Sequence, residues 1–319
     1  GRCPQPVLAR IAPTYRMALT AKTDGGILDR LIDERLDKIR DGALKAEIKK
    51  KYQHYRKTYP EYDWSYRDVE EICDRLCVVG SVPIAQEIVA LICDDVLAPR
   101  LEEFQELERV VSSDPVCDPF IAEFQEKNPD FCITETNRMM LRILFYGIKA
   151  HVFRRVEKRR GGKKGVFFIG PPGCAKTDLT CQVLRMLVPN FNLQKDYLTA
   201  GLNEKAIVIR NKLTQIQKGI VVIDEACGLP STVYESTINQ PDFNGFVIML
   251  SNPPHEFAGR YLPSPACLNR LATCYIPDYT REDGEGIIKQ RFPGLSEEDI
   301  RTCIDIHTSI QAEVYQSPK

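Results

Sequence analysis

The chain has 319 residues, 43% of them hydrophobic and 27% charged, which is the ordinary composition of a soluble globular protein with one or two domains. A formal net charge of −1 excludes an overall field that would recruit nucleic acid or a membrane surface. The sequence shows no transmembrane segment and no secretory signal. Twelve scattered cysteines are typical of reduced thiols, so we expect an intracellular protein, in the cytoplasm more readily than in the nucleus.

Residues 1–153 have the pattern of an all-helical region. Apolar residues three and four positions apart predict helices over Ile27–Ile39, Ala43–Arg56, Leu91–Val111 with a break at Pro99, and Thr134–Val156. Three prolines within Ser112–Ile133 predict a segment that connects two helical units.

The composition changes at the segment Arg154–Lys164, which holds seven basic residues and one acidic residue. Two glycines lie within it, so we interpret it as a solvated basic hinge at a domain boundary. Contact with phosphate or nucleic acid is the alternative. No aromatic residue is interleaved there to stack on bases.

Residues 154–278 alternate between strand and helix patterns. Short apolar runs predict buried strands over Gly165–Ile169, Gly219–Ile223, Phe246–Leu250 and Ala272–Ile276, and Asp178–Leu187 has the pattern of a helix. Apolar strands separated by helices predict an α/β fold, in which helices flank both faces of a mostly parallel sheet.

A glycine-rich loop between the first strand and the following helix is the strongest signal. It consists of Gly170, Pro171, Pro172, Gly173, Cys174, Ala175, Lys176 and Thr177. Such a loop turns successive backbone N–H groups toward phosphate oxygens, at a helix N-terminus that favours anions. Lys176 is suited to the β- and γ-phosphates, and the Thr177 hydroxyl is suited to Mg²⁺. Ala175 replaces the usual glycine before the lysine, which we expect to be tolerated with a negative φ. We therefore expect ATP and Mg²⁺ as ligands.

Polar residues also follow two later strands. Asp224 and Glu225 come directly after a run of four apolar residues, at the strand end where open α/β sheets bind ligands. Asp224 is suited to hold Mg²⁺ through water, and Glu225 is suited to polarise an attacking water. Asn252 follows the next strand and could orient that water or sense the γ-phosphate, although an amide there is often only a turn residue.

Arg270 lies just before the last predicted strand. An arginine at this place could reach the nucleotide of a neighbouring subunit and stabilise transition-state charge. A surface ion pair explains it equally well, and Arg260 is a competing candidate for the same role.

Together these motifs resemble the AAA+ superfamily over about residues 140–319. Alanine before the lysine is similar to the MoxR and midasin-type branch, and Tyr279–Ala312 resembles the start of that branch's helical lid, here residues 279–319. The resemblance implies a homo-oligomeric ring, a hexamer in the usual case, that couples ATP hydrolysis to remodelling of a protein or nucleic-acid partner. It also implies roles for single residues: Lys176 and Thr177 as Walker A, Asp224 and Glu225 as Walker B, Asn252 as sensor 1, Arg270 as arginine finger, and Arg291 or Arg301 as weak candidates for sensor 2.

The layout is also similar to viral superfamily-3 helicases and picornavirus-type NTPases, which carry a helical N-terminal region, a P-loop core and a short tail. Those helicases place a basic pore hairpin between Walker B and sensor 1. The corresponding interval, Cys227–Phe246, contains no Lys or Arg. We therefore rank an RNA or DNA helicase second, a slow nucleotide-dependent switch or scaffold third, and a small-molecule kinase last.

Overall fold

The computed structural model describes residues 32–34, 36–37, 39, 41–59, 65–79, 86–97, 114–157, 162–200, 206–215, 219–230, 232–240, 243–253, 261 and 263–316. Its first part is helical, with α3 (Gly42–Thr58), α4 (Tyr66–Val79), α5 (Gln86–Leu97), α6 (Asp118–Lys127) and α7 (Glu135–Val156). Among these, the two helices predicted over Ala43–Arg56 and Thr134–Val156 are confirmed nearly residue for residue.

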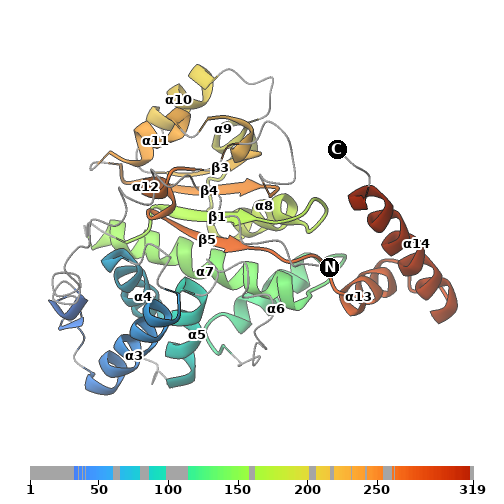
Figure 1. The fold of residues 1–319 in the computed structure, drawn as a ribbon, viewed down its shortest axis with the longest axis horizontal. Helices are drawn as coiled ribbons and strands as arrows, with labels where there is room; N and C mark the ends of the chain where they lie inside the picture. Colours follow the sequence, from blue (N-terminus) through green and yellow to red (C-terminus); the bar gives the residue numbers. More distant parts are fainter. Residues whose placement is uncertain are drawn as a thin grey trace.

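Local hydrogen bonds explain where these two helices begin. Asp41 accepts from the backbone N–H groups of Ala43 at 2.9 Å and Leu44 at 3.1 Å, which caps α3. Thr134 accepts from the N–H of Asn137 at 3.1 Å, which caps α7. Helix α7 is buried on almost every side and packs against one face of the sheet (Figure 1).

The connection expected over Ser112–Ile133 instead contains helix α6. The expectation was wrong because a proline breaks a helix only in its interior. Pro119 stands in the first turn of α6, where a missing N–H leaves no hydrogen bond unmade. Helix α5 ends at Leu97, and the rest of the helix predicted over Leu91–Val111 lies outside the described residues, as does most of Ile27–Ile39.

The second part contains a five-stranded parallel sheet in the order β2-β3-β4-β1-β5. Its strands are β1 (Gly165–Ile169), β2 (Tyr197–Thr199), β3 (Ile220–Asp224), β4 (Phe246–Ser251) and β5 (Leu271–Tyr275). Four of the five were predicted, and β5 begins one residue earlier than expected. The α/β class with a parallel sheet flanked by helices is therefore confirmed.

Alternate side chains of each strand face opposite sides of the sheet. Val166 and Phe168 belong to a core shared with α7 and α8 (Lys176–Leu187), whereas Phe167 and Ile169 face α10 (Ala206–Gln215) and α11 (Thr232–Ile238). The first core also includes Ile48 of α3 and apolar residues of α4 to α7, so the helical part and the sheet bury one continuous surface. Figure 1 shows the resulting layers.

Among its described residues, the second part also contains the short helices α9 (Leu193–Asp196), η4 (a 3₁₀ helix, Ala226–Gly228) and α12 (Pro265–Leu268). The tail then forms α13 (Arg281–Arg291) and α14 (Glu297–Gln316), a helical hairpin beyond the carboxyl ends of the strands (Figure 1). Thr280 and Asp283 cap α13 reciprocally. None of the helices in the described ranges has the length and apolar character needed to cross a bilayer.

Candidate phosphate-binding site

The loop Gly170–Thr177 joins the end of β1 to the start of α8. A Cβ at Gly170 would lie 2.6 Å from the Cβ of Ile276, so only glycine fits there. Gly173 has φ 87°, and a Cβ on it would meet no atom within 4 Å. The negative φ expected at Ala175 is wrong: its φ is 58°, in the left-handed region, at a cost of about 1–2 kcal/mol for a residue with a Cβ.

Lys176 curls beneath this loop. Its buried Nζ donates hydrogen bonds to the carbonyl oxygens of Gly170 at 2.8 Å and Pro171 at 2.6 Å. Asn252, one residue beyond β4, places its Oδ1 3.4 Å from the same Nζ. The structure thus brings the loop lysine and the amide after β4 together.

Asp224, at the end of β3, is surrounded by three donors. Its Oδ2 accepts from the Thr177 hydroxyl at 2.9 Å and from the Tyr197 hydroxyl, while its Oδ1 accepts from the N–H of Glu225 at 2.8 Å. A hydroxyl and a carboxylate are hard oxygen donors, and proteins commonly hold Mg²⁺ with one or two such groups together with substrate phosphates. The pair formed by Thr177 and Asp224 therefore fits Mg²⁺.

Tyr197 was missed by sequence reasoning. It begins β2, where the parallel pairing sets Tyr197 opposite Val222 and Thr199 opposite Asp224. Burial and its hydrogen bond to the Asp224 carboxylate raise the pKa of the tyrosine, so the phenol stays protonated as a donor. No short motif marks such a residue, because only the neighbouring strand brings it to the site.

Cys174 fills the underside of the loop. Its buried Sγ lies 3.1 Å from the carbonyl oxygen of Pro171. Burial raises the pKa of this thiol, which keeps it neutral beside the Lys176 ammonium. It is therefore a neutral group that packs within the loop and donates to the Pro171 carbonyl.

Arg270 lies at the opposite edge of the sheet. Leu271 pairs with Gly165 at the start of β1, and the carbonyl of Arg270 accepts from the N–H of Lys164 at 2.6 Å. Gly170 follows the far end of β1, so roughly 20 Å of strand separates the arginine backbone from its own loop. The structure does not bring Arg270 to the site within one chain.

The remaining candidate residues lie partly beside Asp224 and partly on the tail helices. Glu225 directly follows Asp224 with φ 55°, in the left-handed region. Arg291 ends α13 and Arg301 lies in α14, both exposed on the tail hairpin. Arg260 lies outside the described residues.

The solvated basic hinge predicted over Arg154–Lys164 is wrong for Arg154 and Lys163, which are buried, whereas Arg155 and Glu157 are exposed. Arg154 is 6% exposed and Lys163 1% exposed, and both form ion pairs with acidic residues of α4. The expectation failed because charge alone does not show where partners lie in space. Residues 158–161 lie outside the described part.

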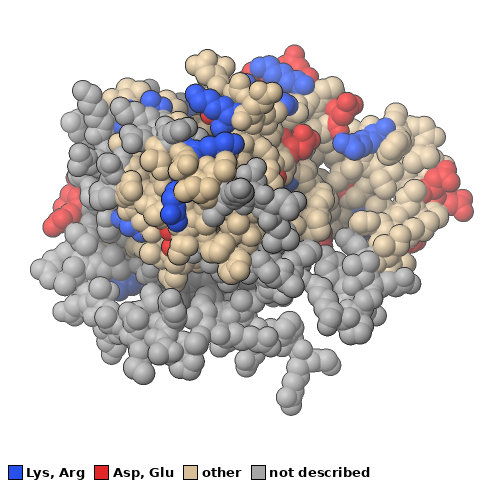
Figure 2. Space-filling model, turned by 90° about the horizontal axis from the view of Figure 1, so that it is seen from above, with Lys and Arg blue, Asp and Glu red and all other residues tan. Residues whose placement is uncertain are grey.

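Figure 2 shows the molecule from above relative to Figure 1, and on this face Lys and Arg side chains are interspersed with Asp and Glu side chains. The described residues between β3 and β4 form η4 and α11.

Comparison with protein-family models and with curated proteins gives no match for this chain.

Proposed function

We propose that this chain is a Mg²⁺-dependent ATPase of the AAA+ kind. The observation that carries the proposal is the hydrogen bond of 2.9 Å between the Thr177 hydroxyl and Asp224. It joins the glycine-rich loop to the carboxylate that ends β3, at the strand ends where α/β sheets bind ligands. An anion at this place also benefits from the N-terminus of the twelve-residue helix α8.

Each residue of the site has a role in this proposal. Lys176 exchanges the loop carbonyls for phosphate oxygens and compensates their charge. Thr177 and Asp224 hold Mg²⁺, which when bound supplies charge neutralisation to the phosphates. Glu225 takes the proton of the attacking water, and Asn252 orients that water.

Arg270 serves a neighbouring subunit in a homo-oligomeric ring. Support comes from its place at the amino edge of β5, a strand length away from its own glycine-rich loop. An arginine in that place can neutralise transition-state charge only across an interface between copies. Hydrolysis in such a ring drives remodelling of a macromolecular partner.

A protein partner is favoured over nucleic acid. Tracking of a single strand needs cations that meet its phosphates, and the interval from Cys227 to Phe246 contains none.

ATP turnover, measured together with oligomeric state, tests the proposal. Phosphate release is followed with Mg²⁺ and ATP, alone and with single-stranded RNA, single-stranded DNA or unfolded protein. We expect turnover by an assembled ring and stimulation by protein. Stimulation by a nucleic acid alone would establish the helicase alternative, slow turnover that no partner changes would establish the switch, and absence of Mg²⁺-dependent turnover would end the ATPase proposal.

A further inference from the structure

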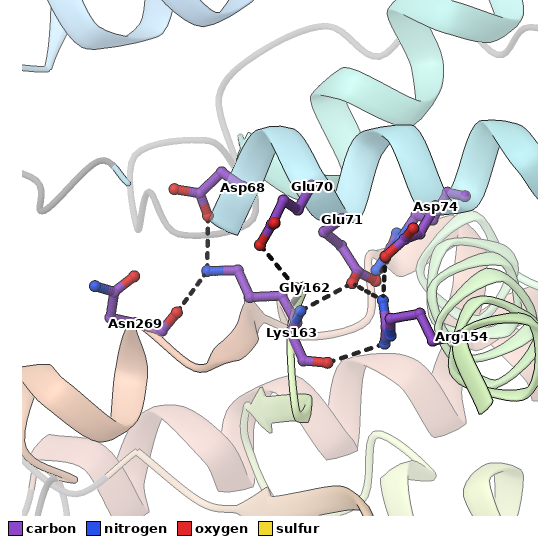
Figure 3. A network of polar contacts seen from close by, with 9 residues as sticks. Asp68, Glu70, Glu71, Asp74, Arg154, Gly162, Lys163 and Asn269 are labelled. Atoms are coloured by element: carbon purple, nitrogen blue, oxygen red, sulfur yellow. Dashed lines mark hydrogen bonds and ion pairs between the residues drawn. The ribbon is translucent and has the colours of Figure 1, made fainter. Parts of the chain in front are cut away.

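A buried ion pair joins the helical part of the chain to the turn that carries Arg270. The Nζ of Lys163 lies 2.7 Å from Oδ1 of Asp68 in α4, and it donates to the carbonyl oxygen of Asn269 at 2.9 Å (Figure 3). The side chains of Lys163 and Asp68 have no exposed surface. The lysine therefore connects α4 directly to the residue before Arg270.

Further hydrogen bonds hold the same turn. The Ser65 hydroxyl donates to Oδ1 of Asn269 at 2.7 Å, and the Ser65 N–H donates to Asp68 at 2.8 Å. On the other side, the N–H of Lys164 donates to the carbonyl of Arg270 at 2.6 Å. The carbonyl oxygens of Asn269 and Arg270 are thus both bound by residues far away in the sequence.

The acidic face of α4 continues this arrangement along its length. Glu70 accepts from the N–H of Gly162 at 3.0 Å, and Glu71 accepts from the N–H of Lys163 at 3.1 Å. Arg154, near the end of α7, lies 2.9 Å from both Glu71 and Asp74 (Figure 3). Helix α4 is therefore bound to α7, to the segment before β1 and to the turn before β5.

Stability alone does not account for so many buried charges. Taking a lysine and an aspartate out of water costs nearly as much as their attraction returns, and apolar residues of similar size often stabilise a fold as well. A hydrogen-bonded ion pair adds direction, because the contact from Lys163 to the Asn269 carbonyl at 2.9 Å weakens when the turn moves away.

We propose that Lys163, held by Asp68, is a positioning residue for Arg270. The inference rests on the proposed role of Arg270 in a neighbouring subunit. Through this contact α4 sets the position of the arginine that each subunit offers to the next. A shift of α4 would change the neighbour's turnover without any contact between α4 and nucleotide.

The test measures how well a subunit donates its arginine. Receiver subunits carry Arg270→Ala and keep an intact loop, and donor subunits carry Lys176→Ala and keep the arginine. Mixed assemblies are then active only where a receiver's loop meets a donor's arginine. The donor's own loop is already inactive, so an effect of a further substitution on that loop does not change the measured turnover.

The decisive donor carries Asp68→Asn and Lys163→Met in addition to Lys176→Ala. Changing both partners avoids leaving either charge of this ion pair alone in the interior, which would strongly destabilise the fold. The matched control donor carries Asp95→Asn and Arg142→Met instead, because that largely buried ion pair (2.5 Å) joins α5 to α7 without touching Asn269. Ser65→Ala is a milder donor that loses the hydroxyl contacts to Asn269 at 2.7 Å and to Asp68 at 3.3 Å and keeps the ion pair between Asp68 and Lys163.

We expect the decisive donor to support turnover about tenfold or more below the Lys176→Ala donor, because displacements near 1 Å can cost a hundredfold. The Asp95/Arg142 control should donate normally, and Ser65→Ala should fall between. Normal donation by both the decisive donor and Ser65→Ala, in assemblies shown to be mixed, would overturn the inference alone. If receiver subunits hydrolyse ATP at the wild-type rate without any donor, the role of Arg270 in the proposed function fails, and this inference fails with it.

Discussion

Thr177 and Asp224 stand 47 positions apart in the sequence, yet the hydroxyl of one donates to the carboxylate of the other at 2.9 Å. The first belongs to the helix after β1 and the second ends β3, and strand β4 lies between those two strands. Their contact therefore depends on the alignment of three parallel strands at the carboxyl edge. It also defines the place where the proposed metal and phosphates meet.

Lys176→Ala is expected to abolish ATP hydrolysis and to weaken nucleotide binding strongly. The variant removes the one ammonium that the structure places beneath the glycine-rich loop, among the described residues, to compensate phosphate charge. Equilibrium binding of ATP and phosphate release measure the two effects. Lys195→Ala, an exposed lysine of α9, is the matched control, and near wild-type binding and turnover by Lys176→Ala would refute the assignment.

Glu225→Gln is expected to bind ATP and to hydrolyse it about a hundredfold more slowly or worse. The amide preserves the shape of the side chain but cannot accept a proton from water. Single-turnover kinetics with saturating ATP separate the chemical step from binding. A normal rate would show that Glu225 is only a structural acid at the start of η4.

Tyr197→Phe is expected to raise the Mg²⁺ concentration for half-maximal turnover about tenfold, since groups that orient metal ligands commonly contribute that much. The phenol holds Asp224, so its loss should leave Mg²⁺-free ATP affinity unchanged. Tyr234→Phe is the matched control, because the buried Tyr234 hydroxyl has no hydrogen-bond partner among the described residues. Equal Mg²⁺ requirements for wild type and Tyr197→Phe would contradict the role.

Arg270→Ala subunits and Lys176→Ala subunits are each expected to be inactive alone and to recover activity when mixed. Some interfaces then pair an intact loop with an intact arginine, whose contribution can be about 10³ in turnover. Phosphate release by a titrated mixture measures the recovery. A protein that stays monomeric with ATP and remains active would overturn the ring itself.

His151 is expected to make the fold less stable in mild acid. Its ring is buried, and burial together with Arg154, Arg155 and Lys164 lowers its pKa from 6.5 to about 3, against a small opposite effect of Glu71. Between these two pKa values the unfolded chain binds the extra proton, so stability rises with pH and is lost as pH falls below 6.5. We expect a loss of about 1 kcal/mol between pH 7 and pH 5.5.

Urea unfolding of wild type and His151→Leu at several pH values checks this expectation. The leucine variant cannot take up the proton, so its stability should change less over the same range. Identical pH profiles for the two proteins would show that other groups cause the acid sensitivity.

Most of the α/β part could be predicted because its information is local. Four strands appear as short apolar runs, and the residues that follow β1, β3 and β4 meet at one edge simply because the strands are parallel. Strand β2 was not predicted because it is too short to form an apolar run. Of its three residues only Leu198 is a fully buried apolar residue. Tyr197, the first residue of this strand, was therefore not predicted as a site residue either.

What the sequence did not predict depends on contacts between distant residues. The charges of Arg154 and Lys163 are typical of a solvated segment, and their burial follows only from the acidic face of α4. Helix α6 was not predicted because a proline such as Pro119 indicates a helix breaker in the sequence. Proline breaks a helix in its interior but is favourable in its first turn, where Pro119 stands.

The left-handed backbone of Ala175 links the shape of the loop to the stability of the fold. Glycine adopts this conformation without steric cost, whereas the Cβ of alanine disfavours it. The surrounding chain must therefore hold the loop in this shape, and the strain is met during folding. Under the proposed function, polyphosphate meets a loop whose backbone the fold has already set, and the fold is slightly less stable for it.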